Sequence, residues 1–113
     1  MLHVLRHQRR PPDPSFGTRL TEEGRALAAS ELYAPLRGLP VVSSPFVRCL
    51  ETVRPWAGSV REDARLSEHV AWPGTTGAPG VPDPETEAQF AERVDAFVRD
   101  LPDLRAGQDL VVC

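Results

Sequence analysis

Three short apolar runs, rich in β-branched residues and separated by stretches with helical spacing, constrain the fold of this chain most. They are residues 2–6 (LHVLR), 39–44 (LPVVSS) and 108–113 (QDLVVC). None of them alternates cleanly between apolar and polar positions, as a strand with one solvent-facing side does. Runs of this kind, with helical patterns between them, are typical of strands covered on both faces. The sequence therefore predicts a three-layer α/β/α fold with a mainly parallel sheet.

One helix is predicted between the first two runs, and another directly after the second run. The first covers about 22–34, because Thr21 caps it, two glutamates occupy its first turn and Pro35 ends it. The second covers about 45–57 and begins at Ser44-Pro45, since serine is a good cap and proline fits the first helical position.

A third helix and a long loop precede the last run. The helix covers about 84–101, starting either at Asp83-Pro84 or at a capping box formed by Thr86 and Gln89. Residues 71–84 (AWPGTTGAPGVPDP) are dense in proline and glycine and predict a long surface loop. Loops of this length are often functional.

Composition and charge describe the class of protein. The 113 residues, 41% hydrophobic and 26% charged, fit one soluble domain spanning 1–113. A formal net charge of -3 argues against a protein that works by coating nucleic acid or an anionic membrane. Cys49 and Cys113 form neither a disulfide framework nor a zinc spacing, and no apolar run approaches a membrane span. We therefore expect a cytoplasmic protein with no membrane or nucleic-acid partner.

Polar residues that follow the first two runs form the candidate site. Arg6 and His7 stand at the carboxyl end of the first predicted strand, and Ser44 stands at the end of the second. Open parallel sheets bind ligands beyond these ends. A helix start at Ser44 would offer backbone N–H groups to an anion, while Arg6 and Arg48 could clamp a phosphoryl group that His7 attacks. Each feature alone is also common on an ordinary polar surface.

In combination and order, these segments resemble a known family. The segment LRHQRRPPD is similar to an N-terminal R-H-G motif, and TRLTEEGRALAA is similar to an L-T-x-x-G-x-x-Q-A helix start. The segment SSPFVRCLETV closely resembles S-S-P-x-x-R-x-x-Q-T-A, and RLSEHVAWPG contains an L-x-E acid. The chain thus resembles the histidine phosphatase (phosphoglycerate mutase-like) superfamily. Its details lean towards the branch that includes ecdysteroid-phosphate and suppressor-of-T-cell-receptor phosphatases.

The resemblance implies a role for each motif residue. His7 would be the nucleophile that forms a phosphohistidine, and Glu68 the proton donor. Arg6 and Arg48 would hold phosphate oxygens, with further donors from Gln8, which replaces the usual glycine, and from the helix start at Ser44. The implied enzyme is a metal-independent phosphomonoester hydrolase that needs no cofactor and acts on a small phosphorylated substrate.

The carboxyl terminus departs from the family pattern. The segment DLVVC resembles the strand that the family follows with S-H-G, whose histidine is a second phosphate ligand, and the given sequence ends at Cys113. We therefore expect a C-terminally incomplete phosphoglycerate mutase-like fold, in which His3 and His69 are not natural substitutes. An uncovered sheet face would favour a homo-oligomer. The alternatives to an active enzyme are an impaired pseudo-phosphatase and a phosphate-binding or interaction domain.

Overall fold

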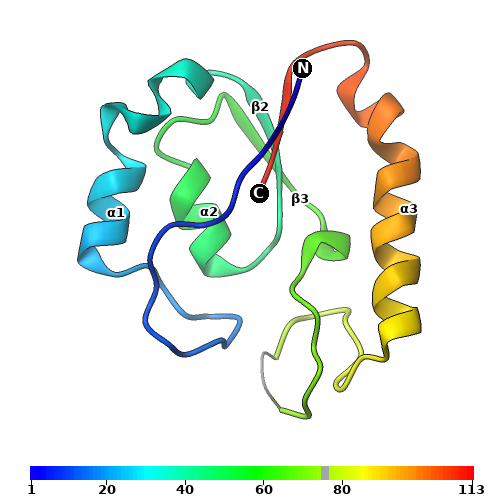
Figure 1. The fold of residues 1–113 in the computed structure, drawn as a ribbon. Helices are drawn as coiled ribbons and strands as arrows, with labels where there is room; N and C mark the ends of the chain where they lie inside the picture. The colour runs from blue at the N-terminus through cyan, green and yellow to red at the C-terminus, as the bar shows by residue number, and fades with distance from the viewer. Residues whose placement is uncertain (75–76) are drawn as a thin grey trace.

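The fold is organised by one parallel sheet of four short strands. The computed structural model describes residues 1–74 and 77–113 (Figure 1). Its strands lie in the order β1-β4-β2-β3, and all neighbouring pairs are parallel. They are β1 (Leu2–Val4), β2 (Pro40–Ser43), β3 (Ser59–Glu62) and β4 (Leu110–Val112). The predicted parallel sheet is confirmed, with each apolar run contributing a slightly shorter strand than expected.

The last strand lies in the middle of the sheet. Leu110 is in register with Leu2 on one side, and Val111 with Val41 on the other. The chain therefore brings the carboxyl ends of β1, β4 and β2 side by side at one edge. The residues that follow these strands, including the predicted site residues His7 and Ser44, begin from that common edge.

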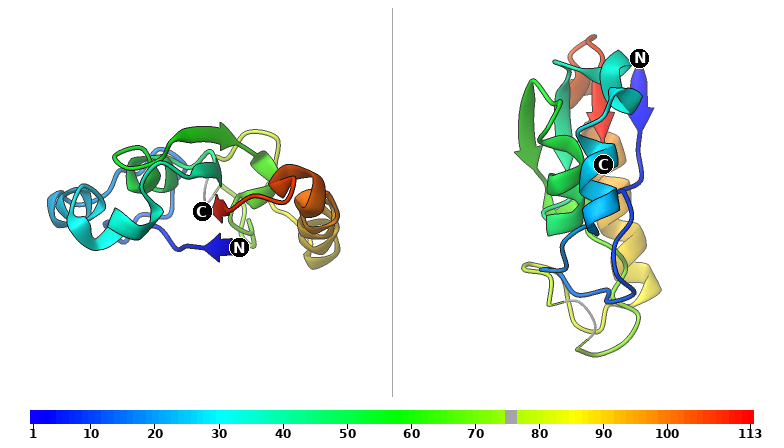
Figure 2. Two further views of the ribbon diagram at one scale, coloured as in Figure 1. Left: turned by 90° about the horizontal axis from the view of Figure 1, so that it is seen from above. Right: turned by 90° about the vertical axis from the view of Figure 1, so that its left-hand side faces the viewer.

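Helices cover both faces of the sheet. Figure 2 shows α1 (Glu22–Ala28) and α2 (Val47–Val53) on one side of the strands and α3 (Glu87–Arg105) on the other. Successive residues of a strand point to opposite faces of the sheet. Because helices cover both faces, two neighbouring residues of a central strand are both buried. Val41 and Val42 are accordingly 2% and 4% exposed. This three-layer arrangement confirms the predicted fold class.

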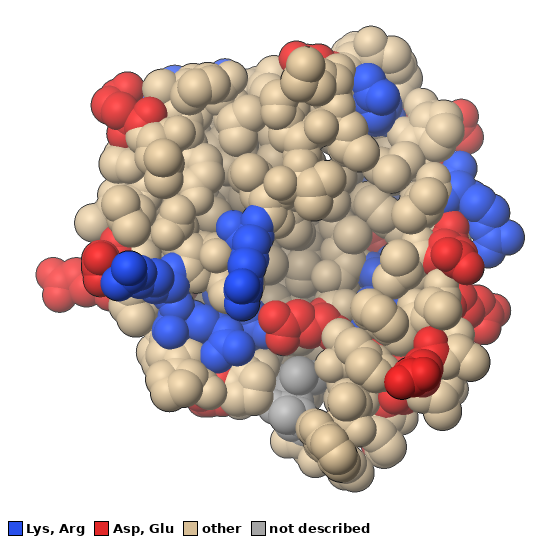
Figure 3. All heavy atoms as spheres, in the orientation of Figure 1, with Lys and Arg blue, Asp and Glu red and all other residues tan. Residues whose placement is uncertain are grey.

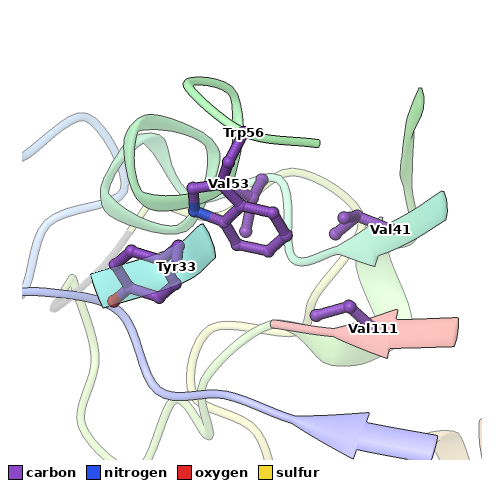
Figure 4. Packing of buried hydrophobic residues seen from close by; sticks show 5 residues of the cluster. All are labelled: Tyr33, Val41, Val53, Trp56 and Val111. Carbon is purple, nitrogen blue, oxygen red and sulfur yellow. The ribbon is translucent and has the colours of Figure 1, made fainter. Parts of the chain in front are cut away.

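Two apolar cores lie on the two faces. The core on the α2 side, drawn in Figure 4, contains the stacked rings of Tyr33 and Trp56, whose centroids are 5.2 Å apart. Its remaining buried members are Val41, Val53 and Val111. The core on the α3 side contains Val42, Phe97, Leu110 and Val112. Burial on both faces explains why the strand sequences are continuously apolar.

The first predicted helix is divided into two. α1 ends at Ala28, and a 3₁₀ helix, η1 (Glu31–Leu36), follows it. The hydroxyl of Ser30 donates to the carbonyl oxygen of Leu27 and accepts from the backbone N–H of Leu32. Ser30 thus closes one helix and caps the next. Its hydrogen bonds to the nearby backbone compete with those of one continuous helix, and the helical spacing of apolar residues does not reveal this competition.

The second helix begins later than predicted. Ser44 does not cap it: α2 starts at Val47, and the Ser44 hydroxyl accepts from the N–H of Phe46 in a tight turn. The backbone N–H of Ser44 donates to the carbonyl oxygen of Cys113, 2.7 Å away. Because the chain at Ser44 is tied to the end of β4, it cannot turn into the helix there.

The third helix is longer than predicted. α3 runs to Arg105, past Pro102, and it begins with the predicted capping box between Thr86 and Gln89. Among residues 1–74 and 77–113, no helix is both long and apolar enough to cross a membrane.

One strand was missed, and one predicted loop is only partly described. β3 (SVRE) is exposed along its whole length at the edge of the sheet, so it lacks the apolar signal of the other strands. A short 3₁₀ helix, η2 (Ala64–Leu66), follows it. The predicted loop 71–84 connects η2 to α3, and its residues 75 and 76 lie outside the described residues.

Candidate active site

Three side chains that are far apart in the sequence meet beyond the carboxyl ends of the strands. His7 follows β1, Arg48 lies at the start of α2, and Glu68 follows η2. The Oε1 atom of Glu68 lies 4.0 Å from Nε2 of His7, and its Oε2 atom lies 2.7 Å from Nη2 of Arg48. Glu68 therefore connects the histidine to the arginine.

The surroundings of His7 fix its tautomer. Its Nδ1 atom lies 2.7 Å from the carbonyl oxygen of Gln8, and a carbonyl oxygen only accepts, so Nδ1 carries the proton and donates. In the neutral ring the lone pair is then on Nε2, the atom that faces Glu68. The side chain is 11% exposed.

The pKa of His7 is lowered below its usual 6.5, mainly because burial disfavours the charged ring. The positive charges of Arg48 and Arg10 lower the pKa as well, whereas the Gln8 carbonyl and Glu68 act in the opposite direction. His7 is therefore neutral and nucleophilic at neutral pH.

Arg48 is a fully buried cation, with an exposed fraction of 0%. Its Nη1 group donates to the carbonyl oxygens of Pro14 and Ser15, and its guanidinium stacks 4.5 Å from the centre of the Phe46 ring. The close contact with Glu68 is an ion pair without hydrogen-bond alignment, and neither Nε nor Nη2 has a hydrogen-bond partner in the described chain. A buried guanidinium with two unmatched donors is well suited to an oxyanion.

A hollow of about 590 Å³ opens beside His7. Its lining is strongly basic and consists of Arg6, His7, Gln8, Arg9, Arg10, Thr21 and Glu23. Figure 3 shows basic side chains gathered near the middle of one face of the molecule, next to an acidic group.

The three arginines of the hollow differ in how they are held. Arg6 is exposed and makes no hydrogen bond or ion pair with the described residues. Arg9 pairs with Glu23 at 3.1 Å, and Arg10 donates to two carbonyl oxygens of its own loop while its Nε atom is unmatched. Arg6 is therefore the arginine most available to a ligand.

Gln8 and Ser44 lie near the site, but their donors are already used. The backbone N–H of Gln8 donates to Oγ1 of Thr52 at 3.0 Å, and its side-chain amide donates to the hydroxyl of Tyr33. Ser44 is 3% exposed, outside the lining of the hollow, and its N–H donates to Cys113. The structure brings His7, Arg48 and Glu68 together, with Arg6 beside the histidine. His7 and Arg6 line the hollow, whereas Arg48, Glu68 and Ser44 do not.

Thr52 is a structural partner of the site that our sequence analysis did not single out. Its hydroxyl donates to the carbonyl oxygen of Arg48 and accepts from the backbone N–H of Gln8, so it joins α2 to the loop after His7. A signal existed, because Thr52 occupies the threonine of the S-S-P-x-x-R-x-x-Q-T-A pattern.

The chain was also compared with known proteins. No family model and no curated protein matches it. Solved structures do match: the TTHB049 protein of Thermus thermophilus is 25% identical with a TM-score of 0.70, over 98% of this chain and 75% of that protein. Mycobacterial hydrolase 1 is 26% identical with a TM-score of 0.67, over 96% and 72% of the two chains.

A third match is mycobacterial glucosyl-3-phosphoglycerate phosphatase, at 24% identity and a TM-score of 0.63. The match covers 96% of this chain and 70% of the phosphatase, and at that identity it establishes a common fold. The chain thus has the phosphoglycerate mutase-like α/β/α fold that its sequence motifs led us to expect.

Proposed function

We propose that this chain is a phosphatase of the histidine phosphatase superfamily, which hydrolyses small phosphomonoesters through a phosphohistidine on His7. The observation that carries the proposal is the meeting of three side chains: a neutral His7 with its Nε2 lone pair available, the buried guanidinium of Arg48, and the carboxyl group of Glu68 within 4.0 Å of the histidine. These groups supply a nucleophile, a positive charge and a proton donor.

In the first step, Nε2 of His7 attacks phosphorus, so that an N–P bond forms while the ester P–O bond breaks. The Glu68 carboxylate accepts the proton of the monoanionic phosphate ester and passes it to the leaving alkoxide, which departs as an alcohol. Arg48 and the exposed Arg6 stabilise the charge on the transferring phosphoryl oxygens.

In the second step, the Glu68 carboxylate removes a proton from water as the water attacks the phosphohistidine. The N–P bond breaks, Glu68 passes this proton to the departing inorganic phosphate, and His7 is again neutral and Glu68 again a carboxylate. Glu68 relays both protons, which come from the ester and from water, so the proposed chemistry needs no metal ion or cofactor.

Two further observations support the proposal. The unmatched Nε and Nη2 donors of Arg48 would gain acceptors from a phosphoryl group. The fold is also that of solved proteins that include mycobacterial glucosyl-3-phosphoglycerate phosphatase.

A second candidate is a protein that binds phosphate without turning it over. This is favoured by the engaged backbone N–H groups of Gln8 and Ser44, because the site then has fewer donors for the transition state than the motifs imply. Such a protein would still hold an oxyanion between Arg6 and Arg48.

Hydrolysis of an aryl phosphate in the presence of a metal chelator separates the two candidates. The phosphatase predicts turnover by the wild-type chain and none by His7→Ala. A binding protein predicts no turnover by either chain, together with calorimetric binding of vanadate that Arg48→Met weakens. Turnover that survives His7→Ala would contradict the proposed mechanism.

A further inference from the structure

A buried ion pair lies beside the site without being part of it. Glu85 precedes α3, and its side chain is 0% exposed. Arg93, on the second turn of α3, donates to it twice: Nε lies 2.6 Å from Oε2, and Nη2 lies 2.9 Å from Oε1. Such a two-pronged contact fixes the plane of the guanidinium as well as its position.

The remaining donors of Arg93 reach the segment that carries Glu68. Nη1 donates to the carbonyl oxygen of Arg65 at 2.8 Å, and Nη2 donates to the carbonyl oxygen of Glu68 at 3.0 Å. One guanidinium therefore holds both ends of the four-residue segment from Arg65 to Glu68. Its planar shape allows these contacts at the same time as the pair with Glu85.

Glu85 contacts the two residues that directly follow this segment. Its Oε1 atom lies 3.1 Å from Nδ1 of His69, and its backbone N–H donates to the carbonyl oxygen of Val70 at 2.7 Å. The hydrogen bonds from Arg93 are the main reason that the pKa of Glu85 is lowered to about 2. The carboxylate therefore remains charged, and paired with Arg93, at neutral pH.

Arg48 contacts the side chain of Glu68, but the backbone of Glu68 lies outside any regular element. Residues 68–70 belong to no helix or strand, and the Glu68 side chain is 47% exposed. Within the described chain, Arg93 donates a hydrogen bond to the carbonyl oxygen of Glu68, and no backbone N–H donates to that oxygen. Yet the carboxyl group must stay within reach of both His7 and Arg48.

We infer that Arg93, held by Glu85, is a positioning residue that places the Glu68 carboxyl group for proton transfer to the leaving group. The inference rests on the proposed phosphatase function for its catalytic meaning. Arg93 itself touches neither His7 nor the hollow. Its effect passes through the backbone of Glu68.

The test compares Arg93→Lys with Arg99→Lys. Lysine keeps the charge opposite Glu85, but its single ammonium group cannot also bind the carbonyl oxygens of Arg65 and Glu68. Arg99 lies exposed on the same helix. Within residues 1–74 and 77–113 its one hydrogen bond goes to a carbonyl oxygen of that helix, at 3.4 Å, so it controls for the substitution itself.

The first readout is the dependence of kcat on the leaving group. A poor leaving group such as an alkyl alcohol needs the proton from Glu68, whereas 2,4-dinitrophenolate leaves without one. We expect Arg93→Lys to lower kcat by roughly 10²-fold on alkyl phosphates and by no more than about threefold on 2,4-dinitrophenyl phosphate. Equal losses on both substrates would show a general structural role and overturn the inference.

The second readout does not depend on activity. The charged and polar groups facing His7 are Glu68, Arg48, Arg10 and the Gln8 carbonyl, and of the charged groups only Glu68 raises the pKa of the ring. If Arg93→Lys displaces Glu68, the pKa of His7 measured by NMR titration falls below its value in the wild-type chain, because the negative charge that raises it has moved away. Glu68→Gln should cause a fall of similar size, and Arg99→Lys none.

These readouts keep the two proposals separate. If the wild-type chain turns over no ester, the proposed function fails while the His7 titration still decides whether Arg93 positions Glu68. An unchanged His7 pKa in folded Arg93→Lys overturns the inference. If Arg93→Lys does not fold, the double variant Glu85→Gln/Arg93→Gln replaces it, because that variant leaves no unpaired buried charge.

Discussion

The nucleophile and the proton donor of the proposed site are held in different ways. The chain around His7 is fixed by backbone contacts: Leu5 extends the pairing of β1 with β4, Gln8 is bound to Thr52, and the carbonyl oxygen of Arg9 accepts from the N–H of Thr21. The chain around Glu68 lies outside any helix or strand and depends on the side chains of Arg93 and Glu85.

This difference fits the demands of the two groups. A nucleophile must approach phosphorus along one line, so rigid attachment to the sheet favours it. The proton carrier must serve first the leaving group and then the water that takes its place, both on the side of the phosphoryl group opposite His7. The contacts from Arg93 and Glu85 give that group a defined place although its segment belongs to no helix or strand.

The largest expected effect concerns His7. His7→Ala should lower kcat on an aryl phosphate by a factor on the order of 10⁴ to 10⁶, because no other group forms the covalent intermediate. His3→Ala is the matched control, since His3 lies on β1 itself and outside the hollow, and it should leave kcat within about twofold. Comparable losses in both variants would mean that the strand, not the nucleophile, had been damaged.

Arg48 should come next. Arg48→Met keeps the length of the side chain but removes the charge and the two unmatched donors, so we expect kcat/KM to fall by roughly 10² to 10³. Vanadate affinity, measured by calorimetry, should fall with it. The control is Arg37→Met, an exposed arginine that follows η1, where neither quantity should change. Unchanged vanadate binding in Arg48→Met would remove Arg48 from the site.

The side of the molecule that holds Glu68 should be the more sensitive to acid. The pKa of Glu85 is near 4.5 when unfolded and about 2 when folded, so its contribution to the free energy of unfolding is complete above pH 4.5. That contribution is lost as the pH falls from about 4.5 towards 2. Urea unfolding over this range should show a steeper loss for wild type than for Glu85→Gln/Arg93→Gln. Parallel curves would contradict the structural role of the pair.

The smallest effect tests the rigid attachment of the His7 loop. A Cβ atom on Gly24 would lie 2.5 Å from the carbonyl oxygen of Arg9, so Gly24→Ala should force α1 away from the loop. We expect a loss of about 1 to 3 kcal/mol in the free energy of unfolding, although alanine normally favours a helix. At Gly17 no atom of the described residues lies within 4 Å of an added Cβ, and Gly17→Ala should be neutral. Equal stability of the two variants would contradict the close packing.

Much of the fold followed from the sequence, because burial on both faces leaves a clear apolar signal. Val41, Val42 and Val111 could be assigned to strands for this reason. β3 could not, since SVRE is exposed at the sheet edge and its pairing with β2 uses backbone groups, which carry no side-chain signal. The division of the first helix at Ser30 depended on local hydrogen bonds that compete with the apolar stripe.

The site was predictable only in part. Strand-end position and motif resemblance pointed to His7, Arg48 and Glu68, which the structure brings together. The positions of Gln8 and Ser44 did not reveal that neighbouring chain segments already bind their N–H groups. Arg93 could not be found either, because a charged residue on an amphipathic helix gives no sign in the sequence that it is 13% exposed and paired.

The most direct test of the account is to trap the covalent intermediate. The wild-type chain is mixed with an aryl phosphate, quenched within milliseconds under alkaline conditions that preserve N–P bonds, and digested for mass spectrometry. The account predicts one phosphorylated histidine, His7, whose labelling persists longer in Glu68→Gln because water attack is slowed. Turnover without a phosphorylated His7, or a phosphoryl group on another residue, would contradict it.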